Sequence, residues 1–166
     1  ITVMRTDSHS FGAFRYFIVP CEQMSLFDTV EEKRATAVNS FFSQLAEMKK
    51  RNWEIKGKKH LLVCNTKLSE DIFICKFSKE TTKTIFKESD DDIENVDEPD
   101  YLFIYVIFDT ARQIALIELK TSVFSSLNQA KEKLKVCFQK TFTLFGFEVL
   151  FEEITDSSTF WNFVSD

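Results

Sequence analysis

Two carboxylates and a lysine lie beside two apolar segments that follow one another in the chain. Asp100 precedes the apolar segment 101–108, and Glu118 and Lys120 close the segment 114–119 as Glu-Leu-Lys. Carboxylate oxygens are the ligands that Mg²⁺ prefers in proteins, and a lysine supplies a compact positive charge. Brought together, these three side chains could hold a hydrated metal ion and an attacking water.

An antiparallel pairing of the two segments around a turn near Thr110 would bring the three side chains together. In that register, Asp100 lies opposite Lys120 and next but one to Glu118. Side chains alternate between the two faces of a strand, so all three would project from one face at one end of the pair. The same residues also suit an ordinary charged strand end, and the pattern leaves both interpretations open.

Apolar periodicity and turn signals predict the elements that must position these residues. Pro20 ends a strand at 14–19, and the capping-box pattern Thr29-Val-Glu-Glu begins a helix that runs to about Lys50. A second capping-box pattern at Ser126 begins another helix, which Gly146 is placed to end. Further strands are predicted at 61–65, 71–77, 101–108, 114–119 and 147–151, with 81–86 extending or following the second of them.

This order predicts one α/β (α+β) domain spanning residues 1–166. Its expected core is a central mixed β-sheet with two main helices, in the order strand, helix, four strands, helix, strand. The chain is long enough for one sizeable core. Residues 87–98 are expected to form an exposed acidic loop, and residues 156–166 a C-terminal tail or short helix.

The order of elements resembles that of the PD-(D/E)xK nuclease superfamily. Pro99-Asp100 opens one central strand and Glu118-Leu119-Lys120 closes the next, as in that family's motif. The resemblance covers about residues 29–152 in topology. In sequence it rests on these positions and, more loosely, on Gln129 in the following helix.

This resemblance implies a metal-dependent nuclease-like domain that hydrolyses phosphodiester bonds, in a bacterial or phage defence system. The implied ligands of Mg²⁺ are Asp100, Glu118, the Leu119 carbonyl and, from the first helix, Glu47 or Glu32. Lys120 would orient the attacking water or stabilise negative charge on the phosphate. Asp100, Glu118 and Lys120 are therefore the expected catalytic residues, and a nucleic acid the expected substrate.

The charge of the chain argues against nucleic-acid binding by simple electrostatics. The formal net charge is −5, which repels phosphate on average. Basic residues nevertheless gather in the run 49–59, whereas the segment 88–100 holds eight acidic residues and no basic one. The basic run is interpreted as a solvated helix end and loop, with a phosphate-facing patch as the minority interpretation.

A non-catalytic protein-interaction or assembly module with the same α/β frame is the alternative function. Three large rings near the C-terminal end, Phe160, Trp161 and Phe163, suit docking onto a protein partner or a second copy, or folding back onto the chain's own sheet. The first residue is Ile1, so the chain is expected to be a piece of a longer polypeptide.

A cytoplasmic protein with buried, reduced cysteines and no membrane association is expected. The four cysteines, Cys21, Cys64, Cys75 and Cys137, are widely spaced within apolar runs and form no zinc-binding pattern.

Overall fold

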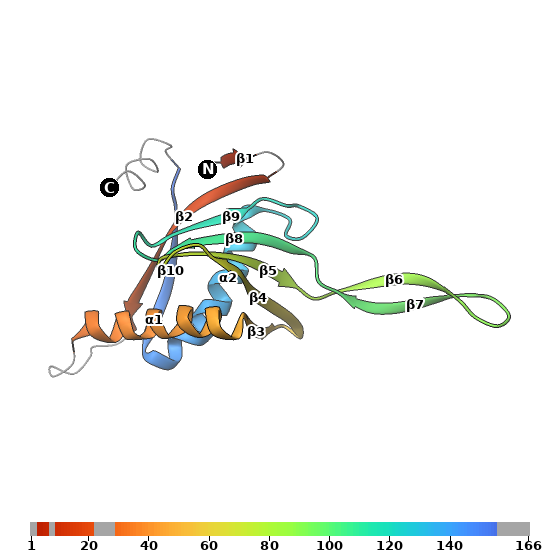
Figure 1. Cartoon of the computed structure of the whole chain (residues 1–166), viewed down its shortest axis with the longest axis horizontal. Coiled ribbons are helices and arrows are strands. Elements are labelled where there is room, and N and C mark those ends of the chain that lie inside the picture. Colours follow the sequence, from red (N-terminus) through yellow and green to blue (C-terminus); the bar gives the residue numbers. More distant parts are fainter. Residues whose placement is uncertain (1–2, 7–8, 22–28, 156–166) are drawn as a thin grey trace.

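Ten strands and two α-helices make up the part of the chain that the computed structural model describes, residues 3–6, 9–21 and 29–155 (Figure 1). The strands are β1 (Val3–Thr6), β2 (His9–Pro20), β3 (Lys50–Ile55), β4 (Lys58–Lys67), β5 (Ile72–Lys79), β6 (Thr81–Glu88), β7 (Ile93–Asp100), β8 (Phe103–Asp109), β9 (Ile114–Glu118) and β10 (Phe147–Glu153). The helices are α1 (Val30–Met48), α2 (Leu127–Phe142) and the short 3-10 helix η1 (Thr143–Phe145). The predicted α+β class with two main helices is confirmed. The aromatic residues Phe160, Trp161 and Phe163 lie outside the described residues.

The large sheet is antiparallel, so the prediction of a mixed sheet was wrong. Its strands follow the order β1-β2-β9-β8-β5-β4-β3, and β10 also pairs with β2. Phe14 of β2 pairs with Ala115 of β9 and with Glu153 of β10, which places these two strands on opposite edges of β2. The connection from β9 through α2 to β10 thus passes over β2. β9 and β10 run parallel, but β2 lies between them.

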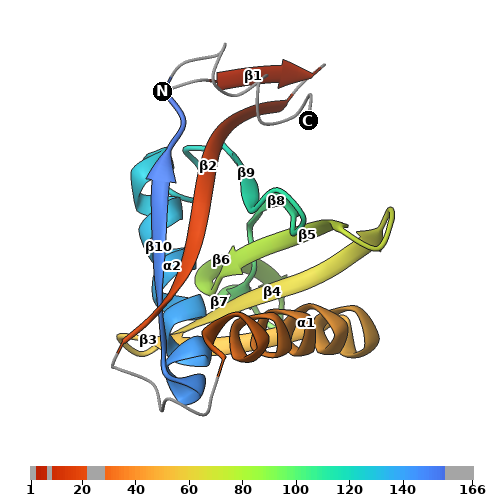
Figure 2. The same cartoon turned by 90° about the vertical axis from the view of Figure 1, so that its left-hand side faces the viewer.

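Both helices pack against one face of the curled sheet, here called the inner face (Figure 2). On α1, Phe41 and Phe42 meet Trp53, Phe73 and Phe108 from the strands, with ring centroids 5.0 to 6.5 Å apart. On α2, Phe138 stacks on Phe108 at 5.4 Å and meets Phe41 at 5.0 Å. This aromatic packing explains much of the chain's phenylalanine content.

Local signals set the ends of the helices, although not in every detail expected. Ser126 caps α2 by accepting a hydrogen bond from the Gln129 amide at 3.0 Å, whereas Thr29 makes no such bond at the start of α1. Gly146, with φ of 83°, ends η1 in the left-handed region as predicted.

The helix α1 ends at Met48, close to the predicted Lys50, but the basic run that was interpreted as a helix end and loop begins a strand. Lys49 adopts φ of 60° and ends α1, and β3 begins at the next residue. Trp53 and Ile55 of β3 are buried in alternation with exposed polar residues. Because charged residues surround Trp53 and Ile55, the sequence pattern did not reveal this short alternation of buried and exposed side chains. A two-residue turn with positive φ at Lys56 and Gly57 then leads into β4.

The hairpin β6–β7 is a continuation of the paired strands β5 and β8. Ser78 pairs with Phe103 at the last step within the sheet, and Thr81 pairs with Asp100 at the first step of the hairpin. The register is the same on both sides of this junction. The hairpin therefore keeps this register beyond the edge of the body, although it forms a separate two-stranded sheet, and it projects along the long axis of the molecule (Figure 1).

Candidate functional site

Asp100 lies in the projecting hairpin, and the predicted pairing that placed it opposite Lys120 was wrong. Its strand partner is Thr81, and its Oδ1 accepts a hydrogen bond from the Tyr101 amide at 3.0 Å. The turn between β8 and β9 is centred further along the chain than Thr110, since Asp109 pairs with Ile114. This shift of register separates the two carboxylates along the ribbon.

Glu118 is a buried carboxylate with two defined partners. It is 5% exposed, and its Oε1 accepts a hydrogen bond from the Tyr105 amide at 3.0 Å. Its Oε2 is hydrogen-bonded to Nδ1 of His9, whose ring packs edge-on against Tyr105 with centroids 5.6 Å apart. His9 is 109 residues away from Glu118 in the chain. The partner became visible only once β2 and β9 were paired.

Lys120 faces an aromatic ring. Its Nζ lies 5.4 Å from the centroid of Phe103, within the range of a cation–π contact. Of the other residues that the nuclease resemblance implied, Gln129 uses its Oε1 to accept a hydrogen bond from the Ser125 amide at 2.8 Å.

Within the described ranges, no group of three or more His, Cys, Asp or Glu side chains is placed to hold a metal ion. Mg²⁺ binding by Asp100 and Glu118, and a catalytic role for these residues with Lys120, stay predictions. What the structure adds to that set is the His9–Glu118 pair.

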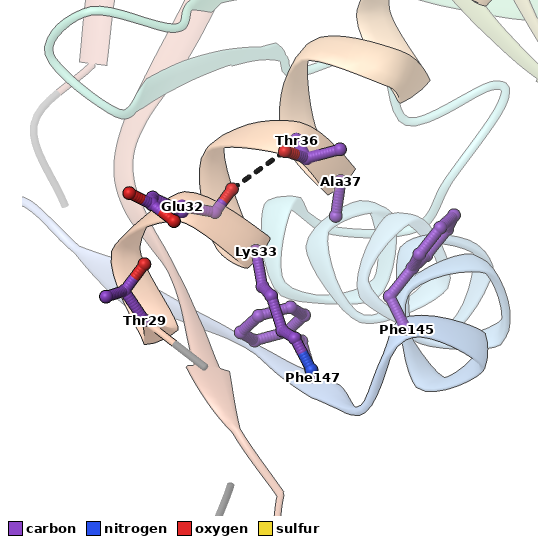
Figure 3. A pocket seen from close by; sticks show the side chains of 7 residues that line it. All are labelled: Thr29, Glu32, Lys33, Thr36, Ala37, Phe145 and Phe147. Carbon is purple, nitrogen blue, oxygen red and sulfur yellow. Dashed lines mark hydrogen bonds between the residues drawn. The ribbon is translucent and has the colours of Figure 1, made fainter. Parts of the chain in front are cut away.

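Two cavities open beside α1. The larger, of about 460 Å³, lies between the first turns of α1 and the residues around η1, and is lined by Thr29, Glu32, Lys33, Thr36, Ala37, Phe145 and Phe147 (Figure 3). Thr36 there donates its hydroxyl to the Glu32 carbonyl at 2.8 Å. The second, of about 370 Å³, is bordered by the Lys67–Glu70 ion pair at 3.3 Å.

The projecting hairpin is the most distinctive surface of the described chain. None of its residues belongs to the hydrophobic core. On one face, Lys83 of β6 lies opposite Glu98 of β7. Next to them on that face, Ile85 lies opposite Val96, and both of these side chains are half-buried. The opposite face, here called the open face, is exposed along its whole length.

Two large apolar side chains stand on the open face near the tip of the hairpin. Phe86 is 71% exposed and Ile93 is 67% exposed. Phe86 pairs with Asn95 and Glu88 pairs with Ile93, so the two apolar side chains are diagonal neighbours across the strands. Diagonal neighbours are within reach of each other when one is aromatic, and together they make a small apolar patch.

The hairpin accounts for the whole net negative charge of the chain. Residues 81–100 hold eight carboxylates and two lysines, a formal charge of −6 against −5 for the whole chain. The rest of the chain therefore sums to +1. The acidic balance that argued against nucleic acid is a property of the hairpin.

The turn at the tip is ordered by its own hydrogen bonds. Ser89 donates its amide to the Asp92 carbonyl at 2.8 Å, and its Oγ accepts from the Asp92 amide at 3.1 Å. Asp90 and Asp91 are held exposed between them. Residues 87–98, expected to be a loop, thus form the ends of two strands and a structured turn.

A scan of protein-family models and searches of curated proteins and of solved structures found no significant match to this chain. Neither α1 nor α2 is long and apolar enough to cross a membrane.

Proposed function

We propose that this chain is a protein-interaction module whose docking element is the hairpin β6–β7. Its partner is a protein that presents an apolar pocket within a basic surface. The observation that carries this proposal is the exposure of Phe86 and Ile93 on a ribbon that contributes nothing to the core and holds a charge of −6.

The apolar patch supplies the affinity in this proposal. Burying a Phe or Ile side chain that is mostly exposed is worth about 1.5–3 kcal/mol. Aromatic side chains that fill pockets are typical interface anchors. Phe86 is also well placed to enter a pocket, because it stands near the end of a narrow projection and its cross-strand neighbour is the smaller Asn95.

The acidic residues around the patch supply selectivity and speed of association. Opposite charge on a partner accelerates encounter and disfavours other acidic proteins, an effect that salt screens. Acidic side chains at the two outer edges of the ribbon also discourage pairing with the strands of unrelated proteins. The hairpin is thus protected from general aggregation while its apolar tip stays accessible.

A capture experiment with matched variants tests the proposal. The immobilised chain is exposed to an extract of its source cells, in parallel with Phe86→Ser and with Leu144→Ser. Leu144 is 84% exposed on η1, so its variant removes an equally accessible apolar side chain from the body.

Support requires one identified protein that the wild type and Leu144→Ser retain and that Phe86→Ser loses. That protein, once purified, must bind the wild type directly and more weakly at high salt. Equal retention of every captured protein by all three chains would reject the hairpin as the docking element.

A further inference from the structure

Three lysines and a buried histidine share one end of the inner face, away from the hairpin tip. His60 of β4 and Lys79 of β5 are directly paired in the register of the sheet. Lys58 precedes His60 by two residues and so shares its face. His60 is buried there, Lys58 is exposed and Lys79 is half-buried, so this end of the inner face carries positive charge at its rim.

Lys133 of α2 approaches the same place from the helix layer. Lys133, Cys137 and Lys140 recur on one side of α2, and Lys140 Nζ donates to the Glu54 carbonyl of β3 at 2.9 Å. That bond fixes this side of the helix over the β3–β4 end of the sheet. In agreement with this placement, the pKa of His60 is lowered by burial, above all, and also by the nearby charges of Lys133, Lys79 and Lys58.

The cluster has no internal counter-charge. In the described part of the chain, neither Lys58, Lys79 nor Lys133 forms an ion pair with a carboxylate. The nearest acids in sequence have other partners or face away: Glu132 pairs with Lys131 at 2.9 Å, Glu80 accepts a hydrogen bond from the Tyr101 hydroxyl at 3.0 Å, and Glu54 is exposed on the opposite face of β3. Three ammonium groups thus repel one another around a common point.

His60 adds an unused polar atom to this point. The side chain is only 2% exposed, and its Nδ1 lies 3.1 Å from the Lys58 carbonyl oxygen, to which it donates. Its Nε2 is buried and has no hydrogen-bond partner among the described residues. Lys79 Nζ lies 5.1 Å from the ring centroid of Phe124, and the imidazole of His60 packs against Phe77 with ring centroids 6.1 Å apart.

We propose that this lysine–histidine cluster, Lys58, His60, Lys79 and Lys133, binds a small oxyanion of the phosphate class. The three lysines supply charge, and the protonated His60 donates a directed hydrogen bond from Nε2. Bound phosphate would satisfy the orphaned nitrogen and relieve the mutual repulsion of the lysines. This inference is independent of the hairpin and does not rest on the docking function.

Inorganic phosphate, compared with chloride at equal ionic strength, is the probe that tests the site. The imidazole signals of the whole chain are followed by NMR over pH, and His9→Gln identifies which of the two histidines is His60. Phosphate is expected to raise the pKa of His60 saturably. Lys79→Gln and Lys133→Gln should each weaken the apparent phosphate affinity by about tenfold.

Two further variants separate a built site from general screening. Lys79→Arg keeps the charge and should keep most of the phosphate response. Lys50→Gln removes one lysine from the opposite face of the neighbouring strand and should leave the response unchanged. An unmoved His60 titration, or equal loss of response in Lys50→Gln and Lys79→Gln, would overturn the proposal.

Discussion

The His9–Glu118 pair gives Glu118, which the sequence predicted to be catalytic, a structural role. Glu118 is buried where β9 ends, and its carboxylate takes the hydrogen bond of the Tyr105 amide that a longer β9 would have taken. A buried carboxylate is costly unless it is well hydrogen-bonded. His9 completes that environment from the start of β2.

Replacing Glu118 is therefore expected to destabilise the fold. Glu118→Ala leaves the Tyr105 amide and His9 without their partner and should cost about 1–3 kcal/mol in the free energy of unfolding. Urea denaturation measures it, with Glu148→Ala on the exposed side of β10 as the control, expected to change little. Equal stability of the two variants would contradict this role.

The nuclease prediction makes a separate demand on the same residue. If Glu118 holds Mg²⁺, the wild type cleaves DNA or RNA in the presence of Mg²⁺ or Mn²⁺. The isosteric Glu118→Gln variant then loses cleavage while its circular dichroism spectrum is retained. A wild type without metal-dependent cleavage, or a variant as active as the wild type, contradicts that role.

His60 gives the fold a pH dependence of defined sign. Burial, above all, lowers the pKa of His60 below its usual 6.5, and the nearby lysines lower it further. The unfolded chain therefore binds a proton at a higher pH than the folded chain does. Stability should be complete above about pH 6.5 and fall as the pH drops from there toward the pKa in the folded state.

Thermal melting in chloride buffers between pH 5 and 8 measures this dependence. His60→Gln, which cannot titrate, should flatten the decline below pH 6.5, and His9→Gln serves as the matched histidine variant. A decline of equal slope in the wild type and His60→Gln would contradict the assignment.

At the scale of elements, the sequence predicted positions better than pairings. The segment 101–108 became β8 and 114–119 became β9, and Ser126 and Gly146 mark the ends of the second helical region as expected. These features depend on local periodicity and turn residues. The register of β8 with β9 depends on the exact position of the turn. The predicted turn was centred too early in the chain, and the predicted pairing of Asp100 with Lys120 was therefore wrong.

Two of the strands that sequence reasoning missed, β3 and β7, share a physical cause. β3 and β7 carry many charges, which conceal a short alternation of apolar residues. β7 in particular is stabilised by its pairing with β6 and has no core face to reveal it. The sequence does contain a signal for β7. The turn-forming segment Ser-Asp-Asp-Asp at 89–92 follows the β-branched residues that begin at Thr81, and Ile93 comes directly after it.

The hairpin should be removable without loss of the fold. Replacing residues 81–100 by an Asn-Gly turn between Glu80 and Tyr101 deletes no core residue. The melting temperature should stay within about 3 °C of the wild type, a change of about 1 kcal/mol for a domain of this size. Calorimetry measures it, and an unfolded or much less stable chain would show that the hairpin supports the body.

At the scale of the whole molecule, charge is distributed between two regions of opposite character. The net charge of −5 is an average over a hairpin of −6 and a remainder of +1 that contains the lysine–histidine cluster. Composition alone could not show this division, because it depends on which acidic residues lie in the projecting hairpin and which lie in the rest of the chain. The division supports two different binding surfaces, one for a basic protein and one for a small anion.

The affinity of the captured partner for matched variants tests the docking function most directly. Isothermal titration calorimetry compares the wild type with Phe86→Ser and Leu144→Ser. Loss of one buried aromatic anchor should weaken binding by about 10- to 150-fold in Phe86→Ser, and Leu144→Ser should bind as the wild type does. Equal dissociation constants for the wild type and Phe86→Ser would contradict the proposal that the hairpin tip is the docking element.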